Sequence, residues 1–229
     1  MKRKNIALIP AAGVGLRFGA GKPKQYVEIG GKTVLEHTVC IFQNHPSIDM
    51  TVVIVSPEDV LADGFQTAFA GVEVWKIGGR TRAETVRNGV AKLLETGLAS
   101  ADDNILVHDA ARCCLPSEAL TRLIVQAGNL EQGGILAVPV ADTLKRVDGG
   151  NISATVGRTG LWQAQTPQLF RAGLLYRALT VENSDGVTDE ASAVEKLGIR
   201  PLLVQGDVCN LKLTQPQDER LVRLLLNAV

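Results

Sequence analysis

The chain has 229 residues, 45% of them hydrophobic, and its 24 Lys and Arg residues balance 24 Asp and Glu residues. This length and apolar content can bury a sizeable core, so we predict that residues 1–229 form a single domain. The neutral balance argues against general nucleic-acid binding, which requires a basic face. No apolar run approaches the roughly 18 residues that span a bilayer, and the start of the chain has no secretion-signal pattern. We therefore expect a cytoplasmic protein.

Short apolar runs alternate with longer amphipathic segments along the chain. Strands separated by helices predict a three-layer α/β fold with a mainly parallel central sheet. In such sheets ligands bind beyond the carboxyl ends of the strands. The predicted strands are 5–9, 50–56, 72–77, 105–108, 134–140 and 201–205. The predicted helices are 34–43, 82–94, 118–132, 189–196 and 215–226.

Several predicted helices begin with residues that cap helices. A hydroxyl side chain followed three residues later by Glu or Gln has the spacing of a capping box, and a hydroxyl before proline is typical of a helix start. The candidate pairs are Thr81 with Glu84, Thr214 with Gln217, and Ser56 with Pro57.

The first predicted strand, 5–9, runs into a glycine-rich loop. This loop holds four glycines and three cations, which are Gly13, Gly15, Gly19, Gly21, Arg17, Lys22 and Lys24. Glycines allow the backbone to approach a ligand closely and to offer its N–H groups. With the three cations, the loop predicts a ligand with several negative charges, and a nucleoside triphosphate fits best. The alternative is an ordinary glycine-rich turn.

Two other phosphate-binding patterns match this loop less well. The dinucleotide fingerprint G-x-G-x-x-G requires glycine where the chain has Phe18, and the glycine comes one residue later. The Walker A pattern requires Ser or Thr where Pro23 follows Lys22.

Two later turns also lie at expected strand ends. Asp109 and Arg112 follow the strand predicted at 105–108. Asp109 could hold Mg²⁺, which commonly binds through one or two carboxylates and substrate phosphates, and Arg112 could bind a phosphate. An ordinary loop aspartate and a surface arginine are the alternatives. The segment 78–85 enters a helix, whose free N–H groups favour an anion or a hydrogen-bond acceptor.

Residues 138–147 and 152–156 alternate in polarity on either side of a turn at Asp148–Asn151. This pattern predicts a β-hairpin, which we place in an arm at about 139–160. Because an isolated hairpin is marginally stable, the arm needs another surface. A partner subunit or the parent domain could supply it.

The motifs taken together are more specific than any one of them. The chain resembles the 2-C-methyl-D-erythritol 4-phosphate cytidylyltransferase family, within the sugar-nucleotidyltransferase group, from its first strand to its last helix. The resemblance rests on Pro10–Arg17 with Pro23–Gln25, His108–Arg112, Asp142–Arg146, Trp162–Gln168, Thr188–Ser192 and Asn210–Lys212.

This resemblance implies a Rossmann-like nucleotidyltransferase fold and an established reaction. Family members join CTP to methylerythritol 4-phosphate and release pyrophosphate, in the non-mevalonate route to isoprenoids. They use Mg²⁺ or another divalent cation. In the family the arm interlocks two subunits, so the resemblance also implies a homodimer. From the balanced charge and the lack of a long apolar run we expect neither nucleic acid nor membrane as a partner.

Matching positions carry the family's residue roles to this chain. The catalytic residues implied are Arg17, Lys24, Arg158 and Lys212. The nucleotide-binding residues are Pro10, Ala11, Ala12, Gly13, Gly15, Gly79, Arg80, Thr85 and Asp109, with Asp109 also holding the metal. The acceptor-binding residues are Arg112, Thr143, Arg158, Thr166, Thr188 and Lys212, and Thr143 and Arg158 would reach the neighbouring subunit's site.

Two positions depart from the family pattern. Arg80 stands where the family usually has an acidic residue, so a side-chain contact to the nucleotide sugar is in doubt there. Cys113 stands where proline often follows the arginine, which changes the stiffness of the loop.

Two other functions remain as alternatives. One is a cytidylyltransferase for another polyol phosphate, such as ribitol 5-phosphate, and the other is a non-catalytic nucleotide-binding regulatory protein.

Overall fold

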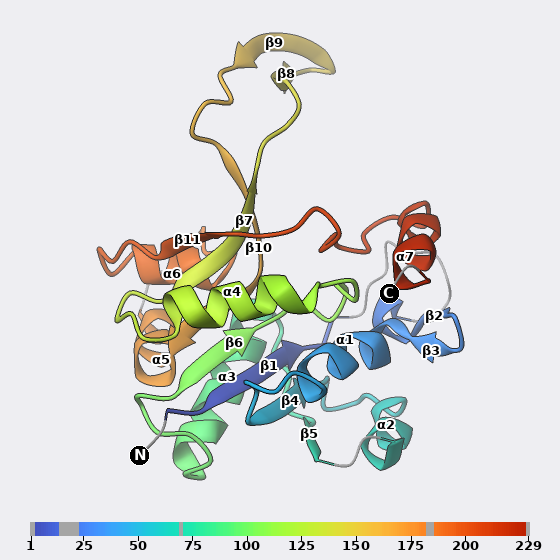
Figure 1. Cartoon of the computed structure of the whole chain (residues 1–229), viewed down its shortest axis with the longest axis vertical. Coiled ribbons are helices and arrows are strands. Elements are labelled where there is room, and N and C mark those ends of the chain that lie inside the picture. The colour runs from blue at the N-terminus through green and yellow to red at the C-terminus, as the bar shows by residue number, and fades with distance from the viewer. Residues whose placement is uncertain (1–2, 14–22, 69–70, 182–185, 228–229) are drawn as a thin grey trace.

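A seven-stranded sheet runs through the middle of the fold (Figure 1). The computed structural model describes residues 3–13, 23–68, 71–181 and 186–227. The strands of this sheet are β1 (Asn5–Pro10), β4 (Met50–Ile54), β5 (Val72–Trp75), β6 (Asn104–Val107), β7 (Gly134–Pro139), β10 (Trp162–Arg171) and β11 (Leu202–Gln205). They lie in the order β11-β7-β10-β6-β1-β4-β5, and only β10 is antiparallel to its neighbours. The six strands predicted from the sequence are confirmed, and each predicted boundary lies within two residues of the observed one.

Helices cover both faces of the sheet and make the predicted three layers (Figure 1). They are α1 (Val34–Gln43), α2 (Ala62–Ala68), α3 (Arg82–Glu95), α4 (Ser117–Ala127), α5 (Ala172–Thr180), α6 (Glu190–Glu195) and α7 (Asp218–Leu226). None of the described helices is long and apolar enough to cross a bilayer.

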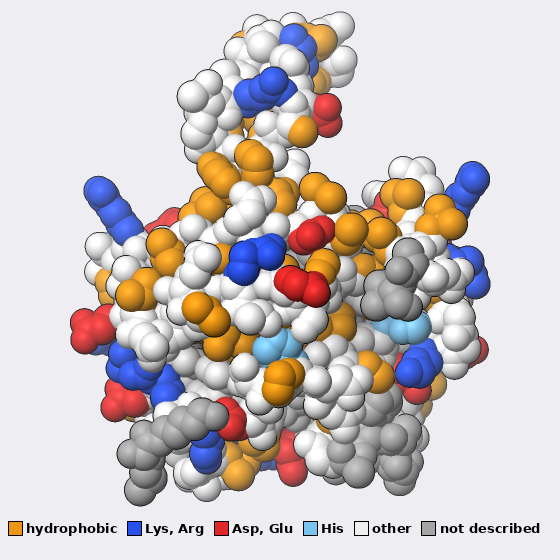
Figure 2. Space-filling view, viewed as in Figure 1, with side chains coloured by type: hydrophobic (Ala, Val, Ile, Leu, Met, Phe, Trp, Pro, Cys, Tyr) orange, Lys and Arg blue, Asp and Glu red, His pale blue; other side chains and the backbone are white. Residues whose placement is uncertain are grey.

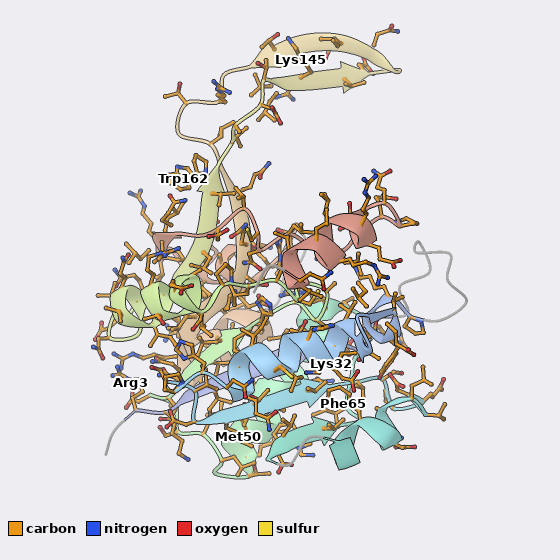
Figure 3. All side chains as sticks on the ribbon, turned by 45° about the vertical axis from the view of Figure 1, so that its right-hand side comes forward. Arg3, Lys32, Met50, Phe65, Lys145 and Trp162 are labelled. Carbon is orange, nitrogen blue, oxygen red and sulfur yellow. The ribbon has the colours of Figure 1, made fainter. Side chains whose placement is uncertain are left out.

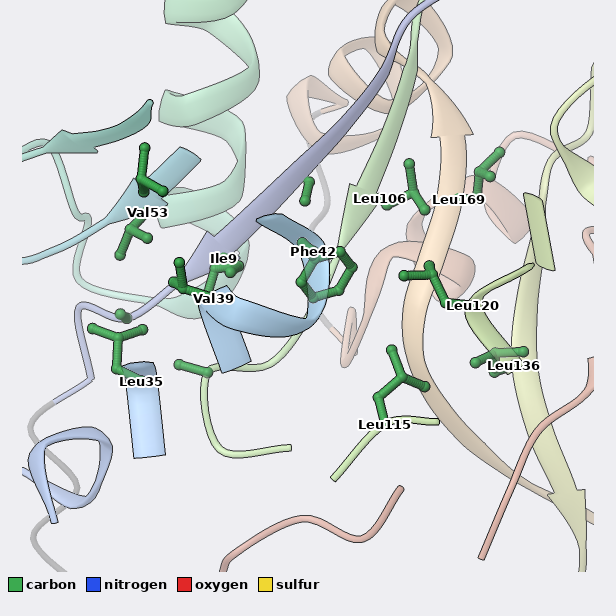
Figure 4. Close-up of a cluster of buried hydrophobic side chains, with 14 of the residues drawn as sticks. Ile9, Leu35, Val39, Phe42, Val53, Leu106, Leu115, Leu120, Leu136 and Leu169 are labelled. Atoms are coloured by element: carbon green, nitrogen blue, oxygen red, sulfur yellow. The ribbon is translucent and has the colours of Figure 1, made fainter. Parts of the chain in front are cut away.

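Strand β1 shows how the sequence pattern produces the layers. Every residue of Asn5–Ile9 is buried, and successive side chains point to opposite faces. Ala7 and Ile9 belong to the hydrophobic cluster beneath α1 and α4 (Figure 4), whereas Ile6 and Leu8 belong to the cluster beneath α3 and α5. A strand covered on both faces therefore appears in the sequence as one continuous apolar run.

Strand β10 was not predicted from the sequence. Half of its residues before Gln168 are polar, and a central proline normally argues against an inner strand. Here Pro167 follows a cis peptide bond with Thr166, and the pairing with β7 is irregular between Ala164 and Gln168. The strand accommodates its proline at this irregularity.

The predicted arm is present as a separate two-stranded sheet of β8 (Leu144–Asp148) and β9 (Asn151–Val156). Gly149 and Gly150 form its turn with φ of 53° and 84°, the left-handed conformations that a tight two-residue hairpin turn requires. The arm leaves the sheet where Pro139 pairs with Trp162. It projects away from the helices, with Lys145 far from Trp162 (Figure 3).

The structure corrects two of the predicted helix starts. No helix follows Ser56, because α2 begins at Ala62, where Asp59 Oδ1 accepts from the N–H groups of Leu61 and Ala62. Helix α7 begins at Asp218.

The predicted capping box at Thr214 is also wrong. The Thr214 hydroxyl donates to the carbonyl of Lys212. The Asp218 carboxylate instead accepts from the N–H groups of Thr214 and Gln215. The carboxylate thus holds the segment before the helix, and no side-chain hydrogen bond among the described residues is found at the Gln217 N-cap of α7.

The structure adds short elements that the hydrophobic pattern did not predict. These are a 3-10 turn at Lys24–Tyr26, the small hairpin of β2 (Glu28–Ile29) and β3 (Lys32–Thr33), and the helices α2 and α5. Helix α4 ends at Ala127, five residues before the predicted end, and α6 spans Glu190–Glu195 within its predicted range.

Candidate active site

A pocket lies at the carboxyl ends of β1 and β6, where the parallel sheet was expected to bind a ligand. It has a volume of about 200 Å³. We call it the β1–β6 pocket, and it is lined by Pro10, Ala11, Ala12, Gly13, Lys24, Gln25, Gly79, Arg80, Thr81, Arg82, Thr85, Asp109, Ala110, Ala111 and Lys212. It therefore brings together most of the predicted nucleotide-binding residues and two predicted catalytic lysines. Gly15, Arg17 and Lys22 lie outside the described residues.

The backbone after β1 is fastened from two sides. The Ala11 N–H donates to the carbonyl of Ile54 at 2.7 Å. The buried Gln25 amide donates to the carbonyls of Ala11 at 2.8 Å and Gly13 at 3.0 Å. Gln25 thus positions the wall of the pocket, a role that sequence reasoning did not assign to it.

The turn between β5 and α3 forms the opposite wall. A side chain at Gly78 would collide with Ala12, so glycine is required for the two walls to approach. The Gly79 N–H donates to the Thr85 hydroxyl at 3.0 Å, and the Arg80 N–H to the Glu84 carboxylate at 2.8 Å. Ordered in this way, the turn presents backbone groups to a ligand.

The predicted capping box at Thr81 is half confirmed. The Thr81 hydroxyl accepts from the Glu84 N–H at 3.1 Å, as predicted. The Glu84 side chain bonds the N–H of Arg80, however, rather than that of Thr81. Helix α3 therefore starts as expected, and its glutamate holds the turn just before the cap.

Asp109 is the centre of charge in the pocket. Its carboxylate lies 2.8 Å from Arg82 Nε, 2.8 Å from Lys212 Nζ and 3.7 Å from Arg112 Nε. Burial raises the pKa of Asp109, but the charges of Arg82, Lys212 and Arg112 outweigh this effect and hold the pKa below its usual range. The carboxylate therefore stays ionised beside the cations.

Arg82 joins Asp109 to a second buried carboxylate. Its two terminal nitrogens donate to Glu190 at 2.6 Å and 3.1 Å, and the Glu190 side chain is only 1% exposed. Burial raises the pKa of Glu190, and the charge of Arg82 offsets part of that rise. Sequence reasoning missed both Arg82 and Glu190 as site residues, because their pairing joins positions 108 residues apart.

Removal of the charge of Glu190 should destabilise the fold. A Glu190→Gln variant leaves the partly buried Arg82 guanidinium, 29% exposed, with one charged partner instead of two. We expect the free energy of unfolding to fall by about 3 kcal/mol, measured by denaturant unfolding. The matched control is Glu195→Gln on the same helix, which is exposed and should change stability by less than about 0.5 kcal/mol. Equal effects in the two variants would contradict this role of Glu190.

A relay of hydrogen bonds fixes the backbone of Asp109. The Asp109 N–H donates to the Thr166 hydroxyl at 3.0 Å, and that hydroxyl lies 3.1 Å from His108 Nδ1. His108 Nε2 lies 2.9 Å from the Arg112 carbonyl. Since a carbonyl only accepts, Nε2 carries the proton and the Thr166 hydroxyl donates to Nδ1. Thr166, which we predicted to bind the acceptor, uses its hydroxyl here to position Asp109.

This relay makes stability depend on pH. Burial lowers the pKa of His108 from 6.5 to about 4. Between these values the unfolded chain binds a proton that the folded chain excludes, so the free energy of unfolding should fall as pH drops from 6.5, by about 3 kcal/mol near pH 4. Unfolding measured across this range without added divalent metal tests the effect. The His108→Gln variant should lose this component of the pH dependence, and an unchanged profile would contradict it.

The remaining predicted residues lie outside the β1–β6 pocket. Arg112 donates to the Asn210 carbonyl at 2.6 Å. Thr188 lines an adjoining pocket of about 180 Å³, which shares Thr81 and Arg82 with the first. Thr143 and Arg158 are exposed near the inner end of the arm, and within one chain the structure does not bring them to the pocket.

The sequence matches one protein family over nearly its whole length. The family model for 2-C-methyl-D-erythritol 4-phosphate cytidylyltransferase matches residues 5–228. A protein of that name from Neisseria meningitidis serogroup C is 80% identical over 229 residues, 100% of each chain. Another of that name, from Chromobacterium violaceum, is 50% identical over 97% of this chain and 98% of its own.

Solved structures agree with these sequence matches. The crystal structure of a 4-diphosphocytidyl-2C-methyl-D-erythritol synthase superposes with a TM-score of 0.91 and 72% identity, covering 99% of this chain and 100% of that one. The 2-C-methyl-D-erythritol 4-phosphate cytidylyltransferase of Francisella tularensis superposes with a TM-score of 0.81 and 33% identity, covering 97% and 99%. The mainly parallel sheet is thus shared with these structures.

Proposed function

Because this chain belongs to the 2-C-methyl-D-erythritol 4-phosphate cytidylyltransferase family, we propose that the β1–β6 pocket is the site where its reaction takes place. The chain transfers a cytidylyl group from CTP to 2-C-methyl-D-erythritol 4-phosphate, giving 4-diphosphocytidyl-2-C-methyl-D-erythritol and pyrophosphate. The observation that supports this location best is the ionised Asp109 between Arg82 and Lys212. It lines the same pocket as the backbone groups that follow β1 and β5.

The residues around the pocket suit an in-line displacement. The acceptor phosphate attacks the α-phosphorus of CTP, and the protein must hold two anions together while charge builds on the leaving pyrophosphate. Lys24, Arg112 and Lys212 supply the positive charge, together with Arg17 from the loop after β1. The backbone of Ala11–Gly13 and of the Gly79–Arg80 turn would surround the cytosine and ribose.

A divalent metal would fit this pocket with one protein carboxylate and with the substrate's phosphate oxygens as ligands. Among the described residues no three His, Cys, Asp or Glu side chains converge to hold a metal ion, so most of the ligands must be phosphate oxygens and water. Mg²⁺ commonly binds in this manner through one or two carboxylates, and Asp109 would supply the carboxylate. Lys212, whose side chain is 42% exposed, can move off Asp109 to admit it. When bound there, such a metal would neutralise charge on the triphosphate.

The arm supports a homodimer. It exposes apolar side chains, with Val147 59% and Ile152 66% exposed, and hydrophobic side chains gather around its base (Figure 2). A second subunit would cover these surfaces and bring Thr143 and Arg158 to its partner's acceptor site, beside Thr188 and Lys212. A variant lacking the arm should sediment as a monomer, and an unchanged dimer would contradict this assembly.

We assign the enzyme to the cytoplasm.

An acceptor panel with CTP tests the function directly. Pyrophosphate release should require CTP, methylerythritol 4-phosphate and a divalent metal together. A faster rate with ribitol 5-phosphate would favour a transferase for another polyol phosphate. Tight CTP binding with no pyrophosphate release from any acceptor would favour a regulatory protein.

A further inference from the structure

All four cysteines of the chain line one pocket. This cysteine pocket has a volume of about 650 Å³ and lies between α1, the start of α4 and the end of α7. Its lining includes His37, Cys40, His45, Cys113, Cys114 and Cys209, among apolar side chains. Histidine side chains are visible on this face of the molecule in Figure 2. The cysteines come from three distant segments, and none of them forms a disulfide.

Cys113 and Cys114 stand apart from the other two cysteines. They occupy a turn two residues before α4, where Cys113 lies in a hydrophobic cluster and Cys114 packs against the same cluster. The interaction between the two thiols lowers the pKa of Cys113 and raises that of Cys114, and the Cys114 thiol also donates to the Val222 carbonyl at 3.9 Å. Cys113 is buried and Cys114 is partly exposed in the pocket. Two sulfur atoms are therefore held close together at the edge of an apolar cavity.

We propose that the Cys113–Cys114 pair is a binding site for thiophilic reagents that take two thiols at once, of the trivalent-arsenic type. An organic arsenous oxide would exchange its oxygen for two As–S bonds, and the two thiol protons would leave with that oxygen as water. No oxidant or reductant is needed, because arsenic stays trivalent. The product carries no charge, so the apolar pocket can hold it without a counter-ion, and the pocket has room for an aryl group.

The described residues favour this chemistry over a conventional metal centre. Zinc requires four nitrogen, sulfur or oxygen ligands in a tetrahedron. Although cysteine and histidine side chains share the pocket, no three such groups among the described residues are close enough together to hold a metal ion. A centre that needs only two adjacent sulfurs is what the geometry provides.

The pair is coupled to the active site through the backbone. Cys113 packs in one hydrophobic cluster with Ala111 and Leu213, and the Leu213 N–H donates to the Ala111 carbonyl at 2.9 Å. Lys212 and Arg112, which both face Asp109, are the residues next to these positions. An adduct that draws Cys113 out of this cluster should therefore displace both cations and stop the transferase.

Phenylarsine oxide is the probe for this site. The intact protein should gain one phenylarsenic group by mass spectrometry and lose at least about tenfold in transfer rate. A small dithiol should restore both the mass and the rate, whereas a monothiol should not. Cys114→Ser should keep its basal activity, bind no arsenical and stay active in its presence. The matched controls Cys40→Ser and Cys209→Ser should respond as the unaltered protein does.

Several results would overturn the proposal. They are an unmodified protein at saturating reagent, an adduct that survives in Cys114→Ser, or protection by Cys209→Ser, which would place the bridge elsewhere. An adduct with full activity would disprove the coupling. Because the mass readout needs no turnover, a failure of the proposed active site would leave the binding result intact.

Discussion

An Asp109→Asn variant is expected to lose about 10³-fold or more in kcat/KM for cytidylyl transfer. Asparagine keeps the size of the side chain but removes the charge that balances Arg82 and Lys212, each 2.8 Å away. Arg82, Lys212 and the nearby Arg112 would then repel one another, and the proposed metal would lose the carboxylate of Asp109. Pyrophosphate release measured across a Mg²⁺ titration tests this expectation, and more Mg²⁺ should be needed for half-maximal rate.

Asp63→Asn is the matched control for this variant. Asp63 pairs with Lys76 at 2.6 Å on the surface, with its side chain 66% exposed, so its removal should leave the rate unchanged. Thermal unfolding should show that the Asp109 variant remains folded under assay conditions. A folded Asp109→Asn protein with a normal rate and a normal Mg²⁺ requirement would remove Asp109 from the mechanism.

A Lys24→Ala variant should lower kcat by about 10³-fold, equivalent to about 4 kcal/mol of transition-state stabilisation. Lys24 lines the β1–β6 pocket, and its amine donates to the Leu213 carbonyl at 3.0 Å. That bond places the charge beside the segment that carries Lys212. Because the proposed contact strengthens as the pyrophosphate leaves, the loss should appear mainly in kcat rather than in KM.

Lys32→Ala controls for the loss of a lysine. Lys32 is exposed on the small hairpin of β2 and β3, and its amine contacts Cys40 Sγ at 3.9 Å. This variant should turn over at the normal rate. If Lys24→Ala changed KM with kcat intact, Lys24 would be a binding residue without a role in the chemical step.

The parts of the fold with a clear hydrophobic period could be predicted from the sequence. Strand β1 and helix α1 follow their patterns, since each buries an apolar surface that its own residues specify. Strand β10 was not predicted because its own sequence has no clear hydrophobic period. Its pairing with β6 and β7 on both sides stabilises it instead. The capping pattern at Thr214 misled in a similar way, because the Thr214 backbone N–H bonds the Asp218 carboxylate and α7 begins only at Asp218.

Some residues of the candidate site could be predicted from the sequence, and others could not. Residues that we predicted to contact a ligand carry local signals, such as glycines after a strand, and the structure gathers Gly13, Gly79 and Asp109 in one pocket. Residues that hold those groups in place carry no local signal. Gln25 and Glu190 each act through a bond to a distant segment, which becomes visible only in three dimensions.

Strand β10 also bears on which changes in chain length the protein can tolerate. It runs from Trp162 at the base of the arm, through the irregular pairing where Thr166 meets the Asp109 backbone, to Gln168, which bonds Asp189 and the Ala191 N–H beside Glu190. One residue inserted within it would turn every later side chain to the opposite face and misplace both contacts at once. We therefore expect insertions and deletions among related sequences to accumulate at the tip of the arm and to be absent from residues 162–168.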